Sequence, residues 1–298
     1  MAKKSMVSIS NLLDLCKLKV VALILLTAIV GMFLAVPAPY FPEWTLVLNA
    51  SAGIGMAAAS AAVFNHVVDE KIDMQMSRTD QRPLPQGKVS RHQALIWGVL
   101  LGVAGLGILQ LFVNTLTMIL TFASLIGYAV IYTLYLKRAT PQNIVIGGAA
   151  GAAPPVLGWT SITGGQNIEF ALLLFLIVFI WTPPHFWALA IHRVKEYEKV
   201  NIPMLPVTHG LAYTRMQILL YTILLVVVTI LPYLTGMSGL IYLAAALILG
   251  VIFLWYAISI NSRPKDVKIA WNTFTYSINY LMLIFLALLV DHYWLITL

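Results

Sequence analysis

Nine long apolar segments run through this sequence, and they constrain its fold more than any other feature. They lie at about 20–36, 44–64, 94–113, 115–135, 143–161, 168–190, 216–234, 239–260 and 273–290. Several reach the roughly 18–20 apolar residues that an α-helix needs to cross a lipid bilayer. The alternating segments of about ten residues that build membrane β-barrels do not occur. We therefore predict an all-α, polytopic membrane protein in which residues 1–298 form a single transmembrane domain with nine helices.

The positions of the Lys and Arg residues predict how these helices are oriented. All 18 fall in the N-terminal segment or in the loops after the second, fourth, sixth and eighth apolar segments, and the intervening loops contain none. Because Lys and Arg concentrate in cytoplasmic loops, we expect a cytoplasmic N-terminus and an external C-terminus. The net charge of +7 then follows from topology, and nucleic-acid binding is not expected. The N-terminal segment lacks a small-residue cleavage site, so we expect it to be retained.

The two long hydrophilic loops, at about 65–93 and 191–215, both fall on the predicted cytoplasmic side. Proline pairs at 154–155 and 183–184 interrupt the fifth and sixth apolar segments. Backbone carbonyls that proline leaves unpaired in a membrane must face protein or a cavity. We therefore predict that the helices surround a central cavity that opens to the cytoplasmic side, with the polar chemistry at that end.

The first candidate site begins where the second apolar segment ends. Asn65, Asp69 and Asp73 are spaced four residues apart, so they share one side of a helix, and Arg78 and Arg82 follow. A charged helix end is often only a solvated surface. Carboxylates stacked in this way also suit Mg²⁺, which is typically bound by one or two carboxylates together with substrate phosphates. Arginine binds phosphate oxygens with bidentate geometry. The pattern thus leaves a solvated helix end and a metal–diphosphate site as the two interpretations.

A second candidate site surrounds the end of the sixth apolar segment. His185 and His192 are seven residues apart and nearly aligned on a helix, and Arg193 and Lys195 continue into the loop. Ionisable groups inside a membrane are functional candidates, and histidine is a common ligand of metals and of haem iron. A histidine that only bonds a neighbouring helix is an equal alternative.

A third candidate group, Lys137 and Arg138, ends the fourth apolar segment. These two residues either anchor the topology or bind a phosphate or propionate group.

Several motifs resemble a known family. N-x-x-x-D-x-x-x-D at Asn65–Asp73, followed by M-x-R-T-x-x-R-P-L at Met76–Leu84, is similar to the first signature of the intramembrane prenyltransferase superfamily. Quinone-type members carry a second aspartate-rich loop after the sixth helix, where this sequence has its two histidines. With Y-L-K-R at Tyr135–Arg138, W-T-P-P-H-F-W at Trp181–Trp187 and N-I-P-M-L-P-V at Asn201–Val207, the whole chain resembles the haem-farnesylating branch of the superfamily.

The resemblance implies a reaction and its participants. The substrates would be farnesyl diphosphate and haem B, joined at a haem vinyl group with addition of water to give haem O, and the cofactor would be Mg²⁺. Asp69 and Asp73 would hold the metal with Asn65 as a neutral ligand, and Arg78 and Arg82 would neutralise the leaving diphosphate. The remaining substrate contacts would come from Lys137, Arg138, His185, His192, Arg193 and Lys195. A bacterial inner-membrane location, and hand-over of the product to a haem A synthase or a terminal oxidase assembly, also follow from the resemblance.

Two other functions compete with this one. A prenyltransferase acting on an aromatic quinone precursor should carry acidic residues where His185 and His192 stand. A haem carrier or transporter should place its ionisable groups near the middle of the bilayer, in broken helices.

Overall fold

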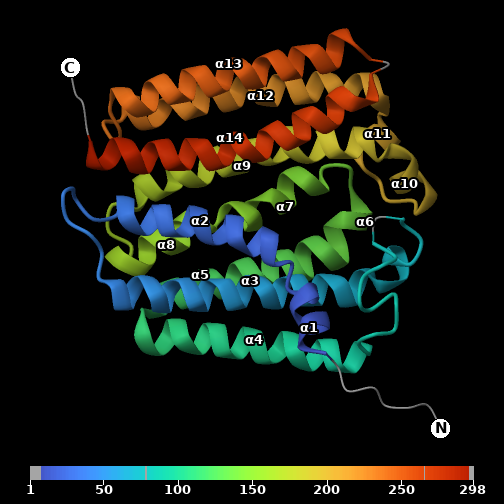
Figure 1. Ribbon diagram of the computed structural model, residues 1–298, viewed down its shortest axis with the longest axis horizontal. Helices are drawn as coiled ribbons and strands as arrows, with labels where there is room; N and C mark the ends of the chain where they lie inside the picture. The colour runs from blue at the N-terminus through green and yellow to red at the C-terminus, as the bar shows by residue number, and fades with distance from the viewer. Residues whose placement is uncertain (1–7, 78, 265, 295–298) are drawn as a thin grey trace.

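The computed structural model describes residues 8–77, 79–264 and 266–294, and every regular element in these ranges is a helix. The elements are α1 (Ile9–Leu15), α2 (Leu18–Leu34), α3 (Trp44–Asp73), α4 (Arg91–Phe112), α5 (Thr115–Ile126), the π-helix η1 (Gly127–Leu136), α6 (Lys137–Ala139), α7 (Asn143–Ala152), α8 (Pro154–Thr163), α9 (Ile168–His192), α10 (Val194–Lys199), α11 (Leu205–Thr208), α12 (Gly210–Leu234), α13 (Leu240–Ser262) and α14 (Val267–Tyr293). The long helices lie side by side along one common direction (Figure 1). The all-α prediction is confirmed for this part of the chain.

The helices that could cross a membrane are less regular than the nine apolar segments of the sequence. Among the described residues, seven helices are long and apolar enough to cross a membrane, and α1 with α2 forms an eighth candidate that is bent by 56°. The predicted span 143–161 is divided at Ala153 into α7 and α8, of ten residues each. Pro154 begins α8, where its missing N–H is tolerated, but it cannot continue the hydrogen-bond ladder of α7. A count of nine crossings and a cavity open to the cytoplasm therefore stay predictions.

The two predicted loops are shorter in the structure, because helices extend into both of them. α3 continues through the predicted loop start at 65 and ends at Asp73. Most of 191–215 is helical, with α10 and α11 lying between α9 and α12. Figure 1 shows α6, α10 and α11 at the same end of the bundle as the turn that follows α3. A buried apolar cluster that includes Met76, Trp187 and Tyr197 joins this turn to α9 and α10. The first and second candidate sites thus share one end of the molecule.

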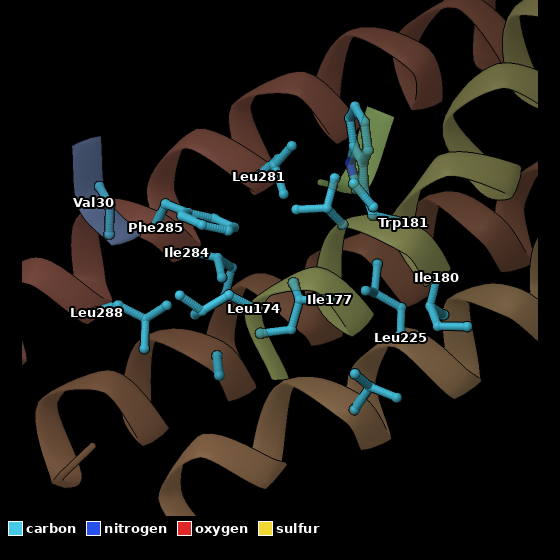
Figure 2. Packing of buried hydrophobic residues seen from close by; sticks show 14 of the residues in the cluster. Val30, Leu174, Ile177, Ile180, Trp181, Leu225, Leu281, Ile284, Phe285 and Leu288 are labelled. Atoms are coloured by element: carbon cyan, nitrogen blue, oxygen red, sulfur yellow. The ribbon is translucent and has the colours of Figure 1, made fainter. Parts of the chain in front are cut away.

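The largest apolar cluster fixes α9 in the centre of one half of the bundle. Figure 2 shows Leu174 and Ile177 of α9 near Leu225 of α12 and near Ile284 and Phe285 of α14, and all five side chains are fully buried. α9 packs against α12 and α14 through these side chains, so it lies between its neighbours. The packing holds the end of α9 that carries His185.

Two glycines allow α2 and α8 to approach until their backbones touch. A Cβ atom at Gly158 would overlap the backbone oxygen of Ala28, and one at Gly31 would overlap the backbone oxygen of Pro155. Small residues permit such close approach between membrane helices. The contact fixes the position of α2, which begins directly after Lys17.

Candidate active site

α3 carries the three predicted metal-site residues on one buried face. Asn65, Asp69 and Asp73 occupy its last turns and are 5%, 2% and 4% exposed. The spacing of four residues on an uninterrupted helix keeps them on one side. Burial to this degree excludes a solvated helix end as their role, because aspartate is almost never fully buried unless it is paired. We call these three residues the acidic row.

Both carboxylates of the acidic row are paired with cationic side chains from later in the chain. Lys137 Nζ lies 2.6 Å from Asp69 Oδ2, and Arg82 Nη1 lies 2.6 Å from Asp73 Oδ2. Removing charges from water is costly, and close pairing of this kind is what makes their burial tolerable. The structure therefore brings the third candidate group to the first through Lys137. Arg78 lies outside the described residues, so its contribution stays a prediction.

Lys17 also belongs to this site, although its sequence position predicts only a charge that sets the topology. Its Nζ donates to Asn65 Oδ1 at 2.5 Å, and Asn65 Nδ2 donates in turn to Asp69 Oδ2 at 2.8 Å. Lys17 lies between α1 and α2 with a φ of 52°, in the left-handed region that residues other than glycine seldom adopt. Lys19 shares its place at the edge of an apolar segment, so the sequence holds no signal that singles out Lys17.

The π-helix η1 brings another buried hydroxyl to the acidic row. Thr133 Oγ1 donates to the backbone oxygen of Tyr128 at 2.7 Å and accepts from Asn65 Nδ2 at 3.4 Å. π-helical turns are rare and are frequent at functional sites. η1 is followed directly by α6, which begins with Lys137 and also carries the exposed Arg138. The wide helix thus positions one of these two basic residues at the site.

The donor atoms of the acidic row fit Mg²⁺. Asp69 Oδ1 is buried and has no hydrogen-bond partner among the described residues, so it is available to a ligand. Asp73 adds a second carboxylate and Asn65 an amide oxygen, which are the oxygen donors that a hard cation prefers. No cluster of three or more His, Cys, Asp or Glu side chains that could hold a metal is found in the described ranges. Further ligands would come from substrate phosphates or water, as is usual for Mg²⁺.

His185 lies between α9 and α14 with one ring nitrogen held in place. Its Nδ1 lies 2.6 Å from Ser277 Oγ, and Ser277 Oγ donates to the backbone oxygen of Phe274 at 2.6 Å. Because that second bond uses the hydroxyl hydrogen, the first requires Nδ1–H of His185 to be the donor. Trp181 and Phe274 stack on the ring, with centroids 4.2 and 4.7 Å from it. The hydrogen bond fixes Nδ1, and the two stacked rings fix the plane of the imidazole. With the proton on Nδ1, Nε2 keeps the lone pair that a metal ligand needs.

The other residues of the second candidate site lie where α9 ends. The ring of His192 is 5.2 Å from that of Trp271, and its Nδ1 is buried without a hydrogen-bond partner among the described residues. Arg193 Nη1 pairs with Glu196 Oε1 at 2.5 Å, whereas Lys195 is exposed. The three-residue spacing of Arg193 and Glu196 is the one sequence signal for this ion pair.

Comparison with known proteins identifies the family to which this sequence is similar. The sequence matches the UbiA prenyltransferase family over residues 24–290. It is 78% identical over 288 residues to the protoheme IX farnesyltransferase of Ruthia magnifica subsp. Calyptogena magnifica, covering 97% of this chain and 96% of that protein. It is 61% identical over 281 residues to the protoheme IX farnesyltransferase of Methylococcus capsulatus, covering 94% and 93% of the two chains.

Solved structures of low sequence identity share the fold. A digeranylgeranylglyceryl phosphate synthase structure matches with a TM-score of 0.79 at 20% identity, covering 96% of this chain and 99% of that one. A UbiA homologue from Archaeoglobus fulgidus bound to GPP and Mg²⁺ matches with a TM-score of 0.63 at 15% identity, covering 93% and 99%.

Proposed function

Because this chain belongs to the UbiA prenyltransferase family, we propose that it transfers a farnesyl group from farnesyl diphosphate to a vinyl group of haem B. The products are haem O and diphosphate. The observation that carries this proposal is the 78% identity, over 97% of this chain, to a protein named protoheme IX farnesyltransferase. The acidic row supports it independently, because buried carboxylates beside cationic side chains suit a metal–diphosphate group.

In this proposal the acidic row binds the diphosphate half of the substrate. Asp69 and Asp73 would hold Mg²⁺, and Asn65 would supply an amide oxygen or orient the neighbouring carboxylate. Bound Mg²⁺ would supply positive charge that stabilises the diphosphate as it leaves. Lys137 and Arg82 exchange their carboxylate partners for phosphate oxygens, and Arg78 adds a further positive charge. Such electrostatic stabilisation is usually the largest single contribution to catalysis.

The reaction itself needs few groups from the protein. The C1–O bond of farnesyl diphosphate breaks, and diphosphate leaves with the bonding electrons. The π electrons of a haem vinyl group then form a carbon–carbon bond to the allylic cation. Water adds to the new cation beside the porphyrin and loses a proton, which leaves a hydroxyl group on the product. The apolar helices hold the farnesyl chain, and they exclude water from the first cation.

The second candidate site binds haem B in this proposal. His185 contacts the iron through Nε2, since Ser277 fixes the opposite nitrogen. Metal-bound histidines usually have their second ring nitrogen held in this way. His192, Arg193, Lys195 and Arg138 lie toward the same end of the bundle and bind the haem propionates.

We expect His185→Ala to weaken haem B binding about tenfold or more and to shift the haem absorption bands, because the iron loses a nitrogen ligand. Absorption titration of purified protein with haem B measures both changes. Ser277→Ala is the matched variant: it keeps the imidazole but frees its orientation, so a smaller loss of affinity is expected. Unchanged spectra and affinity in His185→Ala would exclude the iron contact of His185 and leave His192 as the candidate iron ligand.

The proposed setting is a bacterial inner membrane, with the N-terminus and the site end of the bundle in the cytoplasm. The distribution of Lys and Arg supports this orientation. The whole chain would act as one domain around a central cavity. Hand-over of the product to a haem A synthase or an oxidase assembly stays a prediction.

The direct test is incubation of the purified protein with haem B, farnesyl diphosphate and Mg²⁺, followed by mass analysis of the haem. The haem should gain one farnesyl group and one hydroxyl group, and a chelator should prevent the change. A parallel reaction replaces haem B with an aromatic quinone precursor. Unmodified haem together with a prenylated aromatic product would contradict the proposed acceptor while leaving the prenyltransferase chemistry intact.

A further inference from the structure

His66 is a buried histidine that the site described above does not use. It follows Asn65 on α3 and is 2% exposed. Neither Nδ1 nor Nε2 has a hydrogen-bond partner among the residues that the structure describes. Buried polar groups are nearly always hydrogen-bonded, so an imidazole with both nitrogens unpaired requires an explanation. A bound ligand that accepts a hydrogen bond from the ring is such an explanation.

The surroundings of His66 have the chemistry of an anion site. The ring lines an open pocket of about 290 Å³. The other lining residues are Asp14, Lys17, Gln81, Arg82 and Pro83. Two of these are cationic and one carries an amide, whereas the single acid, Asp14, is exposed. Lysine and arginine together with neutral N–H donors are the groups that bind phosphate oxygens.

The pocket and the acidic row have two side chains in common. Lys17 lines the pocket and donates to Asn65, and Arg82 lines the pocket and pairs with Asp73. A diphosphate consists of two phosphoryl groups that share one oxygen. One phosphoryl group can therefore lie at the acidic row while the other reaches between the two cations into the pocket.

We propose that His66 donates a hydrogen bond to the terminal phosphoryl group of the diphosphate, on the pocket side of the acidic row. Imidazole carries at least one N–H donor in either protonation state, so the contact does not depend on a charged ring. The inference rests on the proposed function, because it takes a prenyl diphosphate as the substrate. It adds a residue at the first unspecified position of the N-x-x-x-D-x-x-x-D pattern, and this residue orients the group that leaves.

The test measures binding of inorganic diphosphate, with Mg²⁺, to the full-length protein in the absence of haem and of prenyl substrate. We expect His66→Phe, which keeps a ring but removes both nitrogens, to weaken binding about tenfold, as for a hydrogen bond to a charged group. We expect His66→Asn, which restores an N–H donor, to recover affinity to within about threefold of the wild type. His92→Phe is the control, because His92 is exposed at the start of α4.

Each outcome decides the inference. Wild-type affinity in a folded His66→Phe protein, verified by its thermal unfolding temperature, would overturn it, as would equal losses in His66→Phe and His66→Asn. Should His66→Phe fail to fold, His66→Leu replaces it with the same expectation. An equal effect on inorganic phosphate without Mg²⁺ would assign the pocket to a free anion instead. A wild-type protein that binds diphosphate through His66 but leaves haem unmodified would keep this inference and contradict only the proposed acceptor.

Discussion

Replacing Asp69 or Asp73 by asparagine is expected to reduce farnesyl transfer by at least about 10²- to 10³-fold, the size of loss seen when one electrostatic contact to a transition state is removed. Each carboxylate is buried and faces a cation, and each is a proposed ligand of Mg²⁺. Asparagine keeps the shape of the side chain but removes the charge that holds the metal. The rate of haem modification, followed by mass analysis with saturating farnesyl diphosphate, measures the effect.

Glu70→Gln is the matched control for these two variants. Glu70 lies on the same helix, but it is directed away from the acidic row and pairs with Arg91 at 3.4 Å, where its side chain is 23% exposed. Its loss of charge should leave turnover within about twofold of the wild type, because surface ion pairs contribute little. Wild-type turnover in either aspartate variant would refute the Mg²⁺–diphosphate role. Thermal unfolding must show that the variants are folded before their rates are compared.

The second large effect concerns stability: Lys137→Met should destabilise the metal-free protein by about 3 kcal/mol, the lower end of the range for breaking a buried ion pair. The Lys137 and Asp69 side chains are 14% and 3% exposed. Removing the ammonium group leaves a buried carboxylate whose other oxygen is already unpaired. Thermal unfolding in detergent without divalent cations measures the change.

A double variant separates the ion pair from simple loss of packing. Asp69→Asn combined with Lys137→Met removes both buried charges, so it should recover most of the stability lost in Lys137→Met alone. Arg91→Met, which breaks the exposed pair with Glu70, should change stability by less than about 0.5 kcal/mol. If the double variant is as unstable as the sum of its two single variants, the pair contributes nothing to the folded state.

The features that the sequence predicted are those that depend on local patterns. Apolar runs of sufficient length predicted an all-α membrane protein, and the four-residue spacing of Asn65, Asp69 and Asp73 predicted a shared helix face. Family membership followed from motifs that stay contiguous in the chain. These properties need no knowledge of which helices meet.

Features that arise from contacts between distant segments left no comparable signal. Lys17 reaches Asn65 across 48 residues, and Lys137 reaches Asp69 across 68. The sequence does not show which basic residues contact the site. Only the structure shows that Lys137 pairs with Asp69 whereas its neighbour Arg138 is exposed. The division of the fifth span at Ala153 and the wide turns of η1 likewise depend on packing rather than on hydropathy.

The ion pairs along α3 have a consequence for the order of events during turnover. In the proposed function, a divalent ion that arrives alone and binds both carboxylates closely would compete with Lys137 and Arg82 for them, and the displaced side chains would lose their anionic partners. An ion that arrives with a diphosphate brings new anionic oxygens for the displaced side chains. Each ligand would therefore raise the affinity for the other, and thermodynamic linkage would require the two enhancements to be equal. The proposed site would therefore bind the ion and the diphosphate more tightly together than it binds either one alone.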